Sequence, residues 1–562
     1  MKSPAKNVAL RAAIAALALL AITPASRAAD GVWDAPNAVS SSWNDAGNWL
    51  GGVIPGGIGS AITIQNNGGA LSLDAPFTIG KFFLDVSASW WELHPGVNGG
   101  ALTFDNGAEM PELWLTPTAN NYRLWLRAPV HGTNGLLIAR NGGGVFCQFF
   151  TSSFTTGIES RNTLSGECVL SNGVVCILGD NNALGSAKVT VHNGTQLRVN
   201  NGLVFTNDIT LAGGALLYSD SYYGAGGFVT FNGTVTSLGS DSIYAGAEGA
   251  PPIVFNGPII GTHPNGTLTF RANATGLSIT LNAPVTLNGE SLGNGNAVFI
   301  HTGAKLVVNN RFTWQGGRVN IKGGSIVFGT DNAFDTENYI RFDTGNETFD
   351  HLFDLNGFNQ RIGGFVDGAT ANDRHSRVTS AKPATLTLDI PENTTRNMNQ
   401  RSYIDGALTV VKTGAGTQQF TCTFADNLID KWIVEDGSLI LNSGLFSANA
   451  LINGGTLGAG TGNPTMLFRF DGDAHDAMIL ESGALDTSRM SIRFEGAPDN
   501  YGEYVILDAS APNTTFTAAA ESPDSPFVFI DELPENCRLK TSADKRKVWL
   551  VLPHPGTMLL IK

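Results

Sequence analysis

The sequence predicts an all-β fold, a right-handed parallel β-helix (β-solenoid) in which short strands of successive coils stack on one another. The first observation is a strand pattern at a fixed spacing, because segments 188–191, 208–211 and 228–231 each end in an apolar–Thr–apolar triplet, 20 positions apart. A period of this length indicates stacked repeats, in which one unit cannot bury its apolar side alone. The right-handed sense follows from the general preference of parallel crossover connections.

A second series shows that this spacing shifts and then resumes. Leu281, Ile300, Ile321 and Phe342 close similar strand-like triplets at intervals of 19, 21 and 21 residues. The third observation is composition, since the chain holds 68 glycines and only 15% charged residues. Glycine accepts the positive φ of tight turns and is unfavourable in helices. The chain therefore fits many short strands joined by tight bends.

Within one coil the side chains alternate. Val189 and Val191, and then Leu197 and Val199, are apolar at every second position on either side of a turn at 192–194. A period of two places one face of each short strand inside. On the order of fifteen such coils fit between residues 135 and 463.

Residues 1–28 are predicted to be a cleaved secretory signal. Lys2, Lys6 and Arg11 form a positive start, 12–22 is an apolar run of 11 residues, and 26–28 offer small residues for cleavage. This run is too short to span a membrane permanently, and no later segment approaches the required length of about 20 apolar residues. We expect a bacterial protein that is secreted or associated with the cell surface, without a transmembrane segment after cleavage.

The charge of the mature chain limits its partners. Loss of residues 1–28 leaves 30 basic residues against 48 acidic ones, a net charge of −18 in place of −14. Nucleic acids and anionic membranes require a positive face, so neither is an expected partner. Extracellular polysaccharides and other surface proteins remain as candidate partners.

The five cysteines, Cys147, Cys168, Cys176, Cys422 and Cys537, show none of the close spacings of zinc or redox motifs. Cys147 and Cys168 are 21 residues apart, close to one repeat, so they could lie on adjacent coils within disulfide range. The alternative is that buried thiols fill the core as small apolar groups. No cofactor is predicted.

Segments 408–417 and 434–442, which read LTVVKTGAGT and VEDGSLILN, are the most distinctive phrases of the chain. Together with 179–194, 352–364 and the tryptophan-rich start, they resemble the autotransporter-associated β-strand repeat of bacterial surface proteins. The resemblance covers about half of the mature chain. It implies a parallel β-helix passenger, in agreement with the periodicity.

The chain departs from that family at its C-terminal end. An autotransporter ends in a long translocating barrel, whereas only about a hundred residues follow Asn463. Segments 504–509 and 547–552 predict strands of a small C-terminal β domain, and 556–562 is predicted to be a last strand. Self-export by the autotransporter route is therefore not expected.

No catalytic residues are predicted. Segment 289–293 (Gly-Glu-Ser-Leu-Gly) matches the pattern of a nucleophile elbow, but that motif needs a strand before it and a helix after it. The surrounding asparagines favour a turn between coils. Gly458, Gly460 and Gly462 lack the lysine and the following helix of a phosphate loop.

Two charged clusters were weighed as sites. Asp471, Asp473, His475 and Asp476 offer ligands for a hard cation such as calcium, but they lack the late bidentate glutamate of a calcium loop. A solvated turn is the prediction there, and no metal site is assigned.

The second cluster offers the best enzymatic alternative. It consists of Asp367, Asp373 and His375 with Arg374 and Arg377. A polysaccharide lyase with a pectin lyase-like β-helix would place acidic and basic side chains on one groove. A loop that bulges from the coils explains the same composition.

Aromatic residues gather before the regular repeats, at Trp90, Trp91, Trp114, Tyr122 and Trp125. We expect them to pack in a cap that covers the open edge of the ladder. The alternative is a surface on which sugar rings stack.

The predicted organisation is a signal peptide at 1–28, an N-terminal β cap at 29–134, solenoid repeats at 135–463 and a C-terminal β domain at 464–562. The predicted function is a non-enzymatic, secreted or cell-surface structural or adhesive element. The alternatives are a polysaccharide-active enzyme and a carbohydrate-binding protein. Acidic and basic side chains on one face would favour the enzyme, and exposed aromatics without them would favour binding.

Overall fold

The structure is a computed structural model of the whole chain. It describes residues 28–554 except 36–40, 66–67, 86–89, 117–121, 143–144, 150–161, 201, 221–226, 247–249, 263–266, 273–276, 289–296, 302–303, 316–317, 336–337, 344–349, 368–375, 399–400, 422–425, 521 and 523. The described residues are almost entirely β-strands, with one short 3-10 helix, η1 (Ala46–Asn48), and they divide into two compact units, 1–210 and 211–562.

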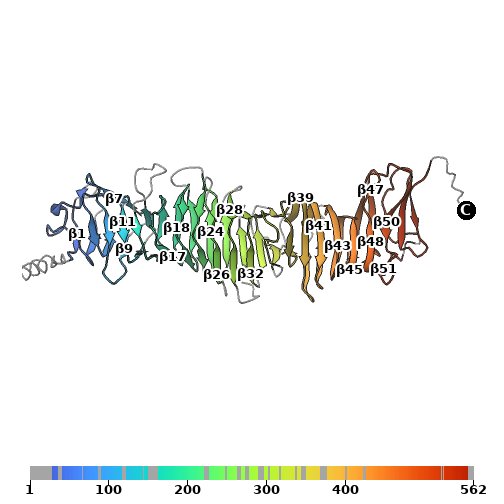
Figure 1. The fold of residues 1–562 in the computed structure, drawn as a ribbon, viewed down its shortest axis with the longest axis horizontal. Helices are drawn as coiled ribbons and strands as arrows, with labels where there is room; N and C mark the ends of the chain where they lie inside the picture. Colours follow the sequence, from blue (N-terminus) through green and yellow to red (C-terminus); the bar gives the residue numbers. More distant parts are fainter. Residues whose placement is uncertain are drawn as a thin grey trace, which may run out of the picture. The chain divides into compact units, whose positions relative to one another are not determined.

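In the first unit, strands one coil apart pair in parallel and form three sheets (Figure 1). The first sheet has the order β1 (Gly31–Trp33), β3 (Ala61–Ile64), β6 (Lys81–Leu84), β9 (Glu112–Leu115), β12 (Leu136–Arg140), β15 (Glu167–Ser171), β17 (Lys188–His192). The second has β2 (Ser41–Ser42), β4 (Gly69–Leu73), β7 (Trp90–Pro95), β10 (Tyr122–Leu126), β13 (Val145–Phe149), β16 (Val175–Leu178), β18 (Gln196–Asn200). The third has β5 (Phe77–Ile79), β8 (Leu102–Phe104), β11 (Val130–Gly132), β14 (Thr163–Leu164), and β19 (Val204–Phe205) follows near the end of the unit.

The second unit repeats this three-sheet arrangement. One sheet contains β23 (Val235–Ser237), β26 (Ile259–Thr262), β29 (Val285–Asn288), β32 (Phe312–Gln315). Another contains β21 (Leu216–Asp220), β24 (Asp241–Ala245), β27 (Leu268–Ala272), β30 (Ala297–His301), β33 (Arg318–Lys322), β35 (Tyr339–Phe342), β38 (Phe365–Asp367). The third begins with β22 (Val229–Phe231), β25 (Ile253–Phe255), β28 (Ser278–Leu281), β31 (Lys305–Val308), β34 (Ser325–Phe328), β36 (His351–Asp354), β37 (Gln360–Ile362).

This third sheet continues to the C-terminal end through longer strands. They are β39 (Ser376–Asp389), β40 (Thr395–Met398), β41 (Ser402–Thr413), β42 (Thr417–Thr421), β43 (Ile429–Val434), β44 (Ser438–Ser447), β45 (Ala450–Ala459), β46 (Pro464–Asp471), β47 (Ala474–His475), β48 (Met478–Asp486), β49 (Ser491–Glu495), β50 (Gly502–Asp508), β51 (Thr515–Thr517), β52 (Phe529–Ile530), β53 (Arg538–Thr541), β54 (Lys547–Leu552). Antiparallel pairing of named strands occurs only near this end of the described chain, as in β46–β47 and β50–β54.

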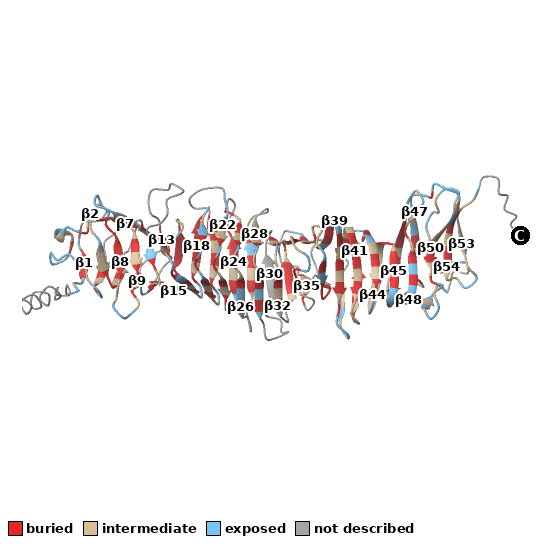
Figure 2. Ribbon diagram, viewed as in Figure 1, coloured by how far each residue is buried: buried red, intermediate tan, exposed pale blue. Residues whose placement is uncertain are grey.

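Each strand has one buried side, as period-two alternation requires. Figure 2 shows buried and partly exposed residues alternating along the strands. Like residues stack on like residues inside, since Phe231 of β22 lies 5.1 Å from Phe255 of β25 with nearly parallel rings. The prediction of an all-β parallel β-helix is confirmed, and its right-handed sense stays a prediction.

The predicted repeat register is partly right. Ile300, Ile321 and Phe342 are successive partners in β30, β33 and β35, as their spacing of 21 indicated. The link from Leu281 to Ile300 is wrong, because Leu281 of β28 is the partner of Val308. Equally, Phe231 belongs to β22, while the sheet neighbour of Leu211 in β20 (Ile209–Ala212) is β23.

The reason for this mismatch is that turn length varies between coils. Hydrogen bonds between equivalent positions of neighbouring coils span 20 residues in one place and 27 in another. A fixed-period search therefore loses the register wherever a turn gains residues.

Parallel pairing also begins early, because Gly31 of β1 is already opposite Ile62 of β3. The segment that the sequence assigns to a cap, 29–134, is thus built of the same kind of coil as the rest of its unit. It starts with a buried cluster of Trp33, Trp43 and Trp49, whose rings meet at 4.9 and 5.0 Å.

An asparagine ladder marks one turn of the second unit. Asn256, Asn282 and Asn309 each donate their side-chain amide to the asparagine one coil before, and the first acceptor is Asn232. The donor–acceptor distances are 3.0, 2.9 and 2.8 Å. Equivalent turns therefore lie in register although the connecting loops differ in length.

Candidate functional site

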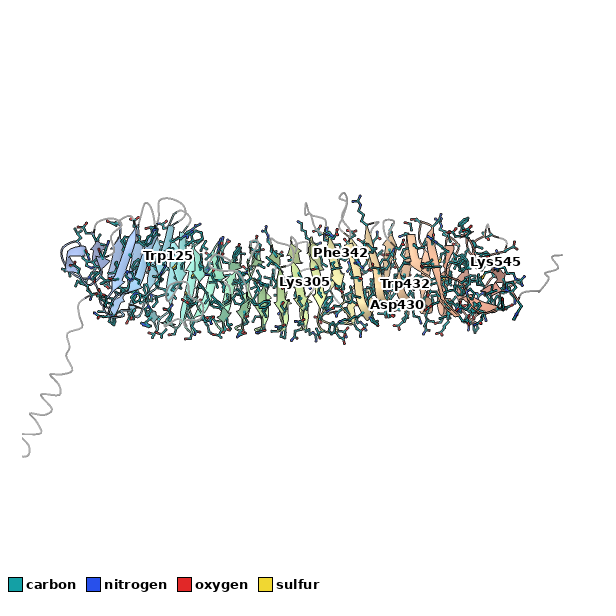
Figure 3. The ribbon with its side chains drawn as sticks, turned by 90° about the horizontal axis from the view of Figure 1, so that it is seen from above. Trp125, Lys305, Phe342, Asp430, Trp432 and Lys545 are labelled. Carbon is teal, nitrogen blue, oxygen red and sulfur yellow. The ribbon has the colours of Figure 1, made fainter. Side chains whose placement is uncertain are left out.

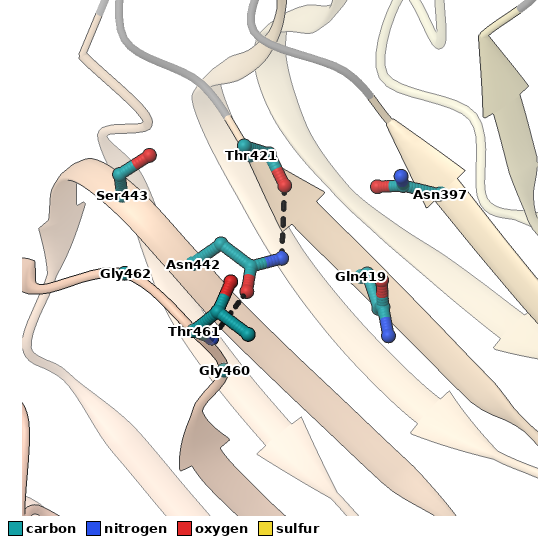
Figure 4. Close-up of a pocket in the computed structure, with 8 residues that line it drawn as sticks. All are labelled: Asn397, Gln419, Thr421, Asn442, Ser443, Gly460, Thr461 and Gly462. Carbon is teal, nitrogen blue, oxygen red and sulfur yellow. Dashed lines mark hydrogen bonds between the residues drawn. The ribbon is translucent and has the colours of Figure 1, made fainter.

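A polar hollow on the outer side of the third sheet of the second unit is the candidate site. Its volume is about 480 Å³, within the range of small-ligand sites. We call it the amide hollow (Figure 4), and its lining consists of Asn397, Gln419, Thr421, Asn442, Ser443, Gly460, Thr461 and Gly462.

Strand alternation places two amides on the outside. Met398 of β40 and Phe420 of β42 are fully buried, so the preceding residues, Asn397 and Gln419, face outward. These two are direct partners in the ladder. The sequence of the two strands therefore presents neighbouring side-chain amides on one surface.

A β-bulge brings in the third amide. Phe420 is opposite Leu441 and Thr421 is opposite Ser443, so Asn442 of β44 is an extra residue without a partner in the ladder. Bulges of this kind redirect a side chain and often accompany functional sites. Here the bulge is associated with an Asn442 side chain that lines the hollow.

The Asn442 amide connects three coils. Its Nδ2 donates to Thr421 Oγ1 at 2.8 Å, and its Oδ1 accepts from the Thr461 backbone N–H at 3.1 Å, as Figure 4 shows. Because both ends of the amide are bonded, its orientation is fixed. Asn442 therefore acts as the wall of the hollow.

Glycine is required beside this wall. A Cβ atom at position 460 would lie 1.9 Å from Asn442 Oδ1, far inside van der Waals contact. Any larger residue at Gly460 would displace the amide and close the hollow. The close backbone approach explains a glycine here without any phosphate loop.

A buried glutamine supports the floor from behind. Gln418 is fully buried and donates through Nε2 to the carbonyl oxygens of Phe365, Arg396 and Gln419 at 3.3, 3.2 and 3.1 Å. Its Oε1 accepts from the Phe365 N–H at 3.0 Å. This network anchors the backbone next to Asn397 and at Gln419, which limits movement of the outward amides.

The lining can form hydrogen bonds but cannot transfer protons near neutral pH. All eight residues are amides, hydroxyls or glycines, none of which titrates in that range. The described part of the chain supplies no hydrogen-bond partner to the side chains of Gln419, Ser443 and Thr461. The hollow therefore offers donors and acceptors to a ligand or to water.

The Asp471–Asp476 cluster does not assemble. Asp473 accepts hydrogen bonds from Asn500 and Tyr504, Asp476 pairs with Arg469 at 3.0 Å, and His475 lies on Phe470. The bonds from Asn500 and Tyr504 lower the pKa of Asp473. Among the described residues, no three His, Cys, Asp or Glu side chains are placed to hold a metal ion.

The second charged cluster is only partly described. Asp373, Arg374 and His375 lie outside the described residues. Arg377 pairs with Asp405 at 2.9 Å, and Asp367 accepts from Ser402 Oγ at 2.7 Å.

A buried histidine that the sequence analysis did not single out lies beside Asp367. His351 Nδ1 is 3.1 Å from Ser376 Oγ, with both residues at most 3% exposed. Burial lowers the pKa of His351, while Asp367 and other aspartates oppose that shift. The imidazole is therefore a neutral hydrogen-bonding group of the interior.

The tryptophans divide between the two sides of the sheets. Trp91 is 1% exposed, as cap or core packing predicts, but the cap prediction is wrong for Trp90, which is 45% exposed. Trp90 stacks on Trp125 of β10 at 5.4 Å (Figure 3 labels Trp125), and Trp114 Nε1 donates to Glu112 at 2.7 Å. The alternation of β7 separates Trp90 from Trp91. The Tyr122 side chain lies outside the described residues.

The proposed Cys147–Cys168 bridge is wrong. Cys147 is opposite Cys176 in the ladder, whereas Cys168 belongs to another sheet, opposite Leu136 and Val189. All three thiols are free and fully buried. Burial raises the pKa of Cys147 and Cys176 strongly and that of Cys168 to about 12. They fill the core as small apolar groups, which is the alternative reading of the sequence.

Several predictions concern residues outside the described set. They are the signal peptide up to residue 27, the elbow-like segment 289–293, Cys422 and the final run 556–562.

Comparison with known proteins found no match to a family model, to a curated protein or to a solved structure. Within the described residues, no helix has the length and apolar character needed to cross a membrane.

Sequence reasoning missed the amide hollow although it noticed one part of it. Gly460 and Gly462 were considered only as a phosphate loop, and that comparison hides their actual neighbour, Asn442. The useful signal was an extra residue in a strand, Asn442, followed one coil later by closely spaced glycines. Without the ladder register this pairing cannot be recognised.

Proposed function

We propose that this protein is a non-enzymatic, exported or cell-surface β-solenoid that acts as a structural or adhesive element toward extracellular partners. The supporting observation is the amide hollow, a surface site whose eight lining residues offer hydrogen bonds and no titratable side chain. Such a lining suits binding better than acid–base chemistry. The resemblance to autotransporter-associated repeats and the apolar start of the chain favour the same role and an extracellular location.

A carbohydrate-binding role is the second candidate. The partly exposed Trp90–Trp125 stack on the first unit favours it, because large aromatic surfaces exposed to solvent commonly mark binding sites.

The test uses the purified mature protein and a panel of insoluble polysaccharides together with extracted surface proteins. Retention and the release of reducing or unsaturated ends are measured in the same samples. Retention without new ends is the expected result. New ends would replace the proposal with an enzymatic function, and absence of retention on every surface would contradict adhesion.

A further inference from the structure

We propose that the amide hollow binds a neutral oligosaccharide segment. This inference rests on the proposed adhesive function and specifies the chemistry of one partner. The hollow places amide and hydroxyl groups from three neighbouring coils around one space, namely Gln419, Thr421 and Asn442 with Ser443 and Thr461. Sugars present many hydroxyl groups, each of which can both donate and accept, and amides match that pattern.

Charge distinguishes a neutral sugar from other polar ligands. An anionic ligand needs a cation in the lining, and a metal ion or basic peptide needs a carboxylate. The lining contains neither. In addition, the whole chain has a net charge of −14, which disfavours acidic glycans at long range. The remaining class is an uncharged ligand rich in hydroxyl groups.

The site is preorganised on its wall and floor. Asn442 is held at both ends of its amide, and Gln418 fixes the backbone beneath the outward amides. Binding therefore loses little side-chain entropy on those sides. The side chains of Gln419, Ser443 and Thr461 lack partners within the described chain and are available to a ligand.

The experiment measures binding of cellohexaose, maltohexaose and laminarihexaose to the full mature protein by isothermal titration calorimetry. Trigalacturonic acid is the acidic comparison, and the polymers cellulose, starch and laminarin test long chains. We expect at least one neutral hexasaccharide to bind and trigalacturonic acid not to bind. Binding of trigalacturonic acid alone, or of no saccharide, overturns the proposal.

Two variants locate the binding. Gln419→Ala removes an outward amide, and Thr461→Tyr fills the hollow at an exposed residue whose own side chain makes no hydrogen bond within the described chain. We expect the dissociation constant to rise about tenfold for Gln419→Ala, the loss of one or two hydrogen bonds, and binding to be lost for Thr461→Tyr. Thr417→Ala, on the same strand and outer face but outside the lining, is the matched control.

These outcomes separate the two proposals. If both variants bind the hexasaccharide like the wild type at unchanged melting temperature, the hollow is not the site and this inference is wrong. If, in addition, the variants are still retained on surfaces, the adhesive function stands without it. If a variant unfolds, the other variant and the saccharide panel on the wild type still decide.

Discussion

Two interiors of this molecule differ in how they accommodate groups that are not plain hydrocarbon. In the first unit, Cys147 and Cys176 lie side by side with Leu124 and Leu197 as their other ladder neighbours, in the middle of strands. In the second unit, a fully buried lysine, Lys412, lies at the end of β41. Mid-strand positions therefore hold apolar thiols, and strand ends hold strongly polar groups.

The difference follows from where unpaired carbonyl groups are found. In mid-strand the ladder uses every backbone carbonyl, so an inward polar atom finds no partner. At a turn carbonyl oxygens are available, and Lys412 Nζ donates to those of Thr413, Gly414 and Asp436 at 2.7, 2.6 and 3.2 Å. Burial lowers the pKa of Lys412 to about 8, against the opposing effect of Asp436 and Asp389.

The largest expected effect comes from removing the ammonium group. Lys412→Met keeps the length of the side chain but leaves three carbonyl groups without this donor, which should cost about 2–4 kcal/mol of unfolding free energy. Urea unfolding followed by circular dichroism measures it. Lys431→Met on β43, which replaces a partly exposed lysine, should change stability by less than about 0.5 kcal/mol. Equal stability of both variants would show that the turn does not depend on Lys412.

A smaller effect tests the apolar character of the first interior. Cys147→Ser places a hydroxyl group among apolar neighbours and should lower the unfolding free energy by about 1–3 kcal/mol. Cys147→Ala only removes the sulfur and should cost less, about 1 kcal/mol. The same urea titration compares them. If serine were tolerated better than alanine, this interior would contain a hydrogen-bond acceptor and the contrast with Lys412 would disappear.

The Lys412 turn also explains what the sequence could predict. The phrase LTVVKTGAGT was identified by resemblance alone, and the structure supplies its physical cause in the lysine and in Gly437 one coil later. A Cβ atom at Gly437 would lie 2.3 Å from the carbonyl oxygens of Gly414 and Gly416 and 2.7 Å from Lys412 Nζ. Local pattern and turn chemistry were therefore readable from the sequence.

Ladder register was only partly readable, and the candidate site depends on it. Ile321 and Phe342 were matched correctly because that coil has a regular length, whereas Leu281 and Cys147 were matched to the wrong neighbours. A single turn of different length moves every later residue against its neighbour. Asn442 and Gly460 meet across two coils, so their contact could not be predicted from composition or spacing.

His351 gives a pH-dependent test of the same contrast. Its interior site favours the neutral imidazole, since burial lowers its pKa below the ordinary value of 6.5 although Asp367, Asp343 and Asp350 oppose the shift. The unfolded chain then takes up a proton first as pH falls. The stabilising contribution is thus present above pH 6.5 and is lost as pH falls through the folded pKa.

We therefore expect the melting temperature of the wild type to fall more steeply between pH 7 and pH 5 than that of His351→Gln, which cannot titrate there. Differential scanning calorimetry at several pH values measures both slopes. Parallel slopes would mean that the imidazole is accommodated in both protonation states, as Lys412 accommodates its charge.

The smallest expected effect concerns polar groups that are stacked outside rather than buried. Asn256 is exposed, donates to Asn232 and accepts from Asn282, so water can replace either bond. Asn256→Ala should cost only about 0.5–1.5 kcal/mol. Asn256→Asp keeps the acceptor for Asn282 but cannot donate to Asn232, and it should fall between the wild type and the alanine variant. A loss as large as that of Lys412→Met in the same urea titration would show that an exposed ladder holds the coils as strongly as a buried turn, which would remove the distinction between strand interior and surface.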